Sequence, residues 1–215
     1  MGDMAFNQRF GGDLKVWGID IGTLMGWGIL SDGAAQQAGS WDLSSDPFDG
    51  FGMRPLRAGL RLDGLLAEHG APTFVAIELP RRHAGTHAAH VWGALAGAVT
   101  SWCERHGIPY RQVGVGRAKL ELAGDGAAGK AAMLAAVTRL WGLDLAGDED
   151  AADACGIALA AWREETGQRS ETAAERAKRE AAERRAAKRV ASAAKRAAAD
   201  AEKRAGVPVW EVQRG

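Results

Sequence analysis

The first third of the chain alternates short apolar runs with glycine-rich breaks. Val16, Trp17 and Ile19 form an apolar run that ends at Asp20, and a second run continues to Leu30. β-branched and aromatic residues in short runs separated by a tight break are typical of a β-hairpin. We therefore predict paired strands over residues 14–20 and 24–30, with a third antiparallel strand over residues 36–43.

Helical spacing of apolar residues alternates with further strands in the next part of the chain. Leu56, Leu60, Leu65 and Leu66 predict an amphipathic helix that ends at Gly70. Either Asp148 or Asp150 is expected to cap the last core helix. The remaining predictions are a strand over 73–79, a small-residue helix over 90–103, a strand over 109–113, a helix over 130–141 with Leu140 in its apolar stripe, and a helix through 162.

This order of elements predicts the fold class. An antiparallel hairpin that leads into strand–helix–strand units gives a mixed α/β sheet with parallel strands added to the hairpin and helices on both faces. We divide the chain into a leader (1–13), an α/β domain (14–163) and a tail (164–215).

Charge separates the body from the tail, although the whole chain is neutral. Residues 1–162 carry 13 Lys and Arg against 18 Asp and Glu, whereas residues 163–215 carry 14 against 9. Residues 171–204 are almost entirely Ala, Lys, Arg and Glu, which favours a solvated helix or a disordered arm. The apolar segment 207–212 is expected to dock on the body or on a partner.

Composition sets aside several classes of protein. No apolar run is long enough to span a membrane, and the N-terminal residues lack a signal-peptide core, so we expect a cytoplasmic protein. Cys103 and Cys155 are expected to be reduced core residues. His83, His87 and His90 have metal-like spacing, but no acid lies among them, and zinc there is disfavoured.

Four acids occupy positions where a carboxylate is costly to bury. Asp20 ends a strand, Glu78 follows a continuous apolar run, and Asp150 and Asp153 are three residues apart on one helix face. Taken singly, Asp20 is explained as a turn residue and Asp150 as a helix cap. Together, hard oxygen ligands without His or Cys suit Mg²⁺ or Mn²⁺. Two such ions about 4 Å apart support phosphodiester hydrolysis.

The segments GIDIGTLMGWGIL, VAIELP, WGALAGAV, KLELAGDGAAGKAAM and DEDAADACGIALAAW resemble, in order, those of RuvC-type Holliday junction resolvases. These enzymes belong to the RNase H-like nuclease superfamily. The resemblance implies a homodimeric, structure-selective endonuclease that acts on branched DNA with two metal ions in each active site. It assigns the metal-binding acids to Asp20, Glu78, Asp150 and Asp153. It also places Lys119 and Lys130 beside the active site, and we expect Arg81, Arg82 and Arg117 to join them in contacting DNA.

Two features depart from the family pattern. Leu79, Pro80, Arg81 and Arg82 follow the strand glutamate where the family often has an aromatic residue that wedges into the junction. The compact bacterial enzymes also lack so long a tail. Both departures are compatible with a divergent, phage-encoded version that accepts a broader range of branched DNA.

Two alternatives come from other functional classes. GIDIGT also resembles the phosphate-binding hairpin of sugar kinases and actin-like ATPases, but those folds need a duplicated domain, and no second such hairpin follows residue 163. A nuclease-inactive, junction-binding protein is the other alternative, and the presence of all four acids argues against it.

Overall fold

The body of the protein is built on one five-stranded mixed sheet. The computed structural model describes residues 13–79 and 85–205. The strands follow the order β3-β2-β1-β4-β5; β1, β2 and β3 pair antiparallel, and β1, β4 and β5 pair parallel. Their bounds are β1 (Lys15–Asp20), β2 (Leu24–Ser31), β3 (Ala34–Asp42), β4 (Phe74–Leu79) and β5 (Tyr110–Gly114).

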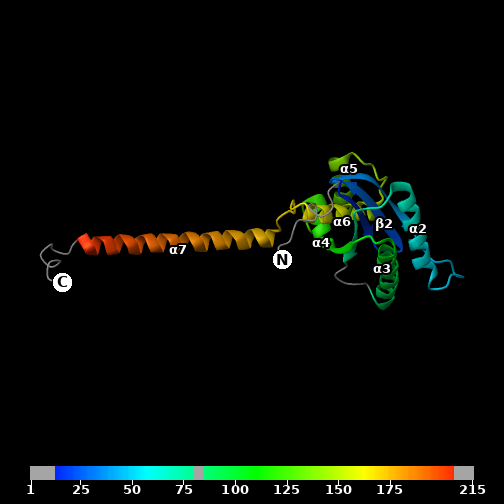
Figure 1. Ribbon diagram of the computed structural model, residues 1–215, viewed down its shortest axis with the longest axis horizontal. Coiled ribbons are helices and arrows are strands. Elements are labelled where there is room, and N and C mark those ends of the chain that lie inside the picture. Colours follow the sequence, from blue (N-terminus) through cyan, green and yellow to red (C-terminus); the bar gives the residue numbers. More distant parts are fainter. Residues whose placement is uncertain (1–12, 80–84, 206–215) are drawn as a thin grey trace. The chain divides into compact units, whose positions relative to one another are not determined.

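Helices cover both faces of this sheet, as the sequence predicts (Figure 1). One face carries α2 and α3, and the other carries α4, α5 and α6. Within the described residues, the helix bounds are α2 (Met53–His69), α3 (Thr86–His106), α4 (Val115–Ala123), α5 (Lys130–Trp141), α6 (Glu149–Glu165) and α7 (Ala173–Ala205).

Alternate residues of the central strand face the two layers. Trp17 packs among α2 and α3 and stacks on Trp102, with ring centroids 5.9 Å apart. Val16 faces the other way, into the core beneath α6. This two-sided burial explains why β1 and β4 are apolar along most of their length and why a carboxylate at their ends stands out.

The structure corrects several details of the sequence interpretation. The helix predicted from residue 90 begins at Thr86, and α4 was not predicted at all. Leu56 and Leu60 do not belong to the buried stripe of α2; they are 54% and 61% exposed. Leu140 of α5 is likewise 43% exposed. Periodicity identified the helices other than α4, but it did not identify which of their apolar side chains face the sheet.

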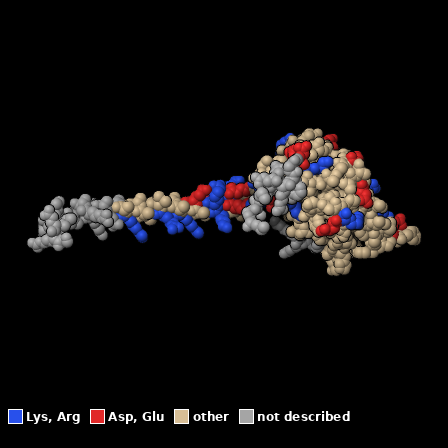
Figure 2. Space-filling view, viewed as in Figure 1, with Lys and Arg blue, Asp and Glu red and all other residues tan. Residues whose placement is uncertain are grey.

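The chain divides into two compact units, residues 1–170 and 171–215. Within the second unit, α7 is helical, and ion pairs join Arg179 to Glu171 and Glu183 near its start. Figure 2 shows Lys and Arg side chains along this helix. The expected leader, except Asp13, and the segment 207–212 lie outside the described residues. In the part of the chain that is described, none of the helices has the length and apolar character needed to cross a membrane.

Candidate active site

Asp20 lies at the centre of the candidate site. It is the last residue of β1, and it pairs with Gly26 at the start of β2. Burial raises the pKa of the Asp20 carboxyl well above its usual range, and the charge of Glu78 and a hydrogen bond with Glu78 raise it further. Asp153 and Asp150 add smaller contributions in the same direction. The four predicted acids therefore act on one another electrostatically.

Glu78 reaches this site through the parallel pairing of β1 with β4. Ile19 pairs with Ile77, so the next residues along the two strands, Asp20 and Glu78, leave the sheet at the same edge. Parallel neighbours end side by side, and for this reason an acid at the end of each strand brings the two carboxylates together.

Close packing of α6 on the sheet brings in the other two acids. A Cβ on Gly26 would lie 2.0 Å from the carbonyl oxygen of Asp150, and one on Gly18 would lie 2.1 Å from that of Ala154. Only glycine allows this approach of helix and strand backbones. The Asp148 carboxylate accepts a hydrogen bond of 3.0 Å from the Ala151 N–H and caps the helix. Asp150 is therefore not the cap of α6, and its carboxylate is available to the candidate site.

The pKa values of the two α6 acids record the balance of charge in the site. Burial raises the pKa of Asp153, and Glu78 and Asp150 add to this increase, whereas the positive charge of Lys119 opposes it. Burial also raises the pKa of Asp150, where Lys130 provides the opposing charge. Both predicted lysines therefore lie within electrostatic reach of the acids.

Lys130, the first residue of α5, is also paired with a neighbour that sequence reasoning missed. Its ammonium donates to Glu149, and this contact raises the pKa of Lys130. Glu149 directly precedes Asp150, and the run of acids at the start of α6 was the available signal for it.

Two bacterial proteins of known activity are similar to this chain over most of their length. No family model matches the chain. A crossover junction endodeoxyribonuclease RuvC from Salinispora arenicola is 35% identical over 178 residues, which cover 77% of this chain and 98% of that protein. The corresponding protein of Gloeobacter violaceus is 31% identical and covers 69% and 88%.

The chain belongs to the RuvC family.

Solved structures agree with this assignment. Thermus thermophilus RuvC in complex with a Holliday junction substrate matches with a TM-score of 0.63 and 28% identity, over 72% of this chain and 97% of that one. The yeast mitochondrial Holliday junction resolvase Ydc2, at 16% identity and a TM-score of 0.51, shares the fold. RuvC membership replaces the kinase-like alternative. The relatives give no support to a phage origin.

Arg117 has a structural partner in this RuvC-family chain. Its guanidinium donates to the Glu121 carboxylate at 3.1 Å and to the Ser170 carbonyl at 2.7 Å. Arg163 donates to the same carboxylate at 2.9 Å, and the backbone N–H and hydroxyl of Ser170 add two more hydrogen bonds. Sequence reasoning missed this buried cluster, and the contact of Arg117 with DNA stays a prediction. Arg81, Arg82 and His83 lie outside the described residues.

The donor set of the site suits a hard divalent cation. Within 13–79 and 85–205, no three His, Cys, Asp or Glu side chains are grouped closely enough to hold a metal ion as they stand. The carboxylates nevertheless raise one another's pKa around the partly buried Asp20, which is the repulsion that a cation relieves. Oxygen donors alone fit Mg²⁺ or Mn²⁺.

Proposed function

We propose that this protein is an endodeoxyribonuclease that resolves Holliday junctions and related branched DNA in the bacterial cytoplasm. One observation carries the proposal: in a chain of the RuvC family, Asp20 is surrounded by the charges of Glu78, Asp150 and Asp153. Carboxylates gathered at one edge of a sheet have a clear use in phosphodiester hydrolysis and no evident use in packing.

The four carboxylates would bind Mg²⁺ or Mn²⁺, with two ions in each active site. When bound, such ions supply an activated water and stabilise the charge that develops on the leaving oxygen. Asp20 and Glu78 come from a rigid sheet, and Asp150 and Asp153 come from a helix locked against it by Gly18 and Gly26. The protein thereby holds the ligands in place before the substrate arrives, which lowers the cost of reaching the transition state.

Lys119 and Lys130 would act on the phosphate. Each places a positive charge near the acids, because the charges of both lysines lower the pKa of Asp153. A compact ammonium near the scissile phosphate stabilises the negative charge that increases during attack. The exposed Lys130 is held toward the site by Glu149.

A homodimer would provide the two active sites that symmetric cleavage of two strands requires. The exposed Leu56 and Leu60 on α2 lie beside a shallow groove that Gly59 and, from α3, Ala98 and Ser101 also line. Apolar and small side chains without cover suit close helix packing between two copies. We place the dimer contact on this α2–α3 face.

Cleavage of a labelled four-way junction by the purified protein tests the proposal. With Mg²⁺ we expect paired nicks in strands of like polarity, and no product in EDTA or from a linear duplex of the same sequence. Binding of the junction without any cleavage in Mg²⁺ or Mn²⁺ would favour the nuclease-inactive alternative.

A further inference from the structure

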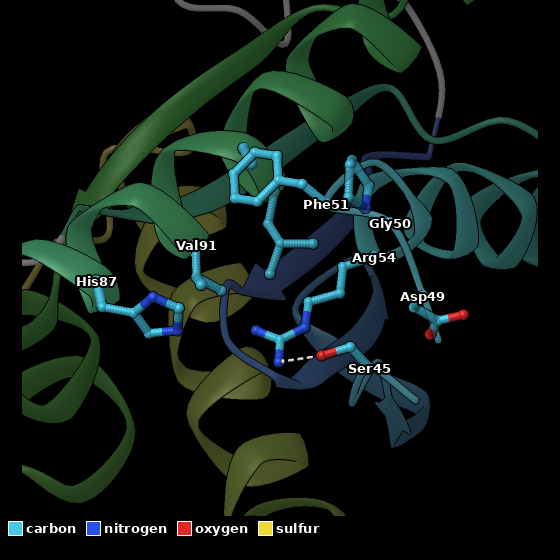
Figure 3. Close-up of a pocket in the computed structure, with 10 residues that line it drawn as sticks. Ser45, Asp49, Gly50, Phe51, Arg54, His87 and Val91 are labelled. Carbon is cyan, nitrogen blue, oxygen red and sulfur yellow. Dashed lines mark hydrogen bonds between the residues drawn. The ribbon is translucent and has the colours of Figure 1, made fainter. Parts of the chain in front are cut away.

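A pocket of about 290 Å³ lies between the loop formed by residues 43–52 and the first turns of α2 and α3 (Figure 3). The loop leaves β3 at Asp42, which pairs with Leu24 at the start of β2. Asp20 pairs with Gly26 on the same strand. The pocket and the catalytic carboxylates therefore open at the same edge of the sheet.

The walls of the pocket combine an aromatic ring, apolar side chains and polar groups. Phe51, which is 71% exposed, lines the pocket, and Val91 and Leu95 of α3 supply further apolar surface (Figure 3). Arg54 from α2 and His87 from α3 approach from different sides. A flat aromatic face with hydrogen-bonding groups at the rim is how proteins hold an unstacked nucleobase.

The loop that carries Phe51 is held by its own hydrogen bonds and by one ion pair to α2. The backbone N–H of Asp46 donates to the Asp49 carboxylate at 2.8 Å, and that of Phe48 donates to Asp46 at 3.0 Å. Arg57 forms an ion pair of 2.6 Å with Asp49. Phe48, at the tip, is 98% exposed. Two phenyl rings on a loop that is held by these contacts are positioned for a partner at little further entropic cost.

Charge in the pocket favours a nucleic acid. Arg54 donates to the Ser45 hydroxyl at 2.8 Å, and its buried Nε–H has no acceptor among the described residues. A base edge or a phosphate supplies such acceptors. Asp49 also lines the pocket, and hydrogen bonds from the Asp46 backbone and from Arg57 lower its pKa, so the negative charge of this acid is already paired with Arg57.

We propose that this pocket receives an unpaired nucleobase from the branch point of the DNA, stacked on Phe51 with its polar edge toward Arg54 and His87. The inference rests on the proposed junction-nuclease function and adds a base-binding subsite to it. A base that leaves the stack only at a branch point would make the subsite a reader of DNA structure.

Junction binding in EDTA, where no strand is cut, tests the subsite. Phe51→Ala should weaken binding about tenfold, the size of one lost base–aromatic stack, whereas Phe51→Trp should retain affinity. Tyr110→Ala is the matched control, because Tyr110 is a partly exposed aromatic residue at the start of β5, on the opposite edge of the sheet. Its affinity should equal that of wild type.

A series of junctions with one abasic nucleotide near the branch point adds the decisive comparison. At one position the wild type should lose about tenfold, and Phe51→Ala should lose nothing further. Additive losses at every position, or wild-type affinity of Phe51→Ala, would overturn the inference. So would a change in the sedimentation of Phe51→Ala, which would assign the loop to contact with a second copy. Failure of the proposed function is separately visible, as a wild-type protein that does not prefer the junction to a linear duplex.

Discussion

At the scale of single residues, the proposed site gathers negative charges that the core of a fold would otherwise avoid. Asp20 is partly buried beside other acids, and its raised pKa means that ionising its carboxyl opposes folding. Glu121 is the opposite case: its buried carboxylate is fully paired and contributes to stability. The two acids therefore have opposite effects on the stability of the same domain.

Replacing Asp20 should lower the cleavage rate and raise the stability of the fold. Asp20→Asn should lower the cleavage rate at least about a hundredfold, since metal-assisted charge stabilisation is worth several kcal/mol. It should bind junctions as well as the wild type or better, because a negative charge is removed. Gel-based cleavage and binding assays measure both. Asp153→Asn should behave alike, and wild-type cleavage by either variant would refute the site.

The same substitution has a predictable pH dependence. Because the folded-state pKa of Asp20 lies above the ordinary aspartate value of 3.8, the cost of its charge is absent below pH 3.8 and is fully present above the raised pKa. Without divalent ions, Asp20→Asn should therefore be more stable than the wild type at neutral pH, and this difference should vanish in acid. Melting temperatures across pH check the sign.

Lys119→Ala and Lys130→Ala should reduce cleavage more than stability. Each removes a charge near the acids while leaving the hydrophobic core intact, so we expect a cleavage rate about ten- to a hundredfold lower with a nearly unchanged melting temperature. Lys178→Ala, on α7, provides the control. Parallel losses of melting temperature and rate would instead indicate a structural role.

Glu121→Gln should destabilise the body by about 3 kcal/mol at neutral pH, because it removes the buried negative charge to which Arg163 and Arg117 both donate. Burial alone would raise the pKa of Glu121, but the hydrogen bonds from Arg163, Ser170 and Arg117 outweigh it and lower the pKa below the ordinary glutamate value of 4.5. This stability is present above pH 4.5 and is lost as the pH falls through the folded-state pKa. Denaturant unfolding should show the variant and the wild type converging in acid, and a constant difference would contradict this account.

At the scale of elements, the contact of α6 with the sheet sets the geometry of the site. Gly26 allows the backbone at Asp150 to approach β2, and Gly18 does the same at Ala154 on β1. Such contacts transmit any change in strand shape directly to the helix that carries two of the acids.

Gly26→Ala should therefore displace α6 and impair the site. The added methyl group has backbone rather than a flexible side chain as its neighbour, so we expect a loss of more than about 2 kcal/mol in stability and a cleavage rate reduced beyond that explained by unfolding. Gly64→Ala in α2 is the control: nothing lies within 4 Å of its new Cβ, and alanine favours the helix. Full activity of folded Gly26→Ala would show that the contact is dispensable.

At the scale of the whole molecule, an acidic body is joined to a basic helix. The acids of α7 whose side chains are described, Glu175, Glu180 and Glu183, all lie in its first third. The basic residues that follow are spaced to form a stripe on one face of the helix. They are Arg184, Arg185, Lys188, Arg189, Lys195 and Arg196.

We predict that this stripe binds phosphates without regard to sequence. Changing Lys188, Arg189, Lys195 and Arg196 to Gln should weaken junction binding and make the slope of log affinity against log salt shallower by about 3 to 4. Truncation after Glu171 should do the same while keeping a folded, dimeric nuclease. The cut falls there because Ser170 is bonded to Glu121. An unchanged salt slope together with loss of the dimer would make the tail an assembly element.

The sequence by itself determined the order of the strands and of every core helix except α4, and it singled out the four acids that the fold brings near one another. Strand and helix periods in an α/β chain are local properties, and a carboxylate after an apolar run, as at Glu78, is conspicuous in any context. The fold class and most element bounds could therefore be predicted from the sequence alone. The assignment of Asp148 as the cap needed the structure, since Asp148 and Asp150 are equally good cap residues in isolation.

Tertiary structure decided what depends on residues far apart in the chain. Leu56 and Leu60 have helical spacing, yet only the position of α3 decides that they stay exposed. Glu121 is an ordinary helix residue until Arg163 and Ser170 fold onto it. The pocket beneath Phe51 exists only because the 43–52 loop and the start of α3 meet at one edge of the sheet. Packing free energies of this kind arise between elements, and no local pattern encodes them.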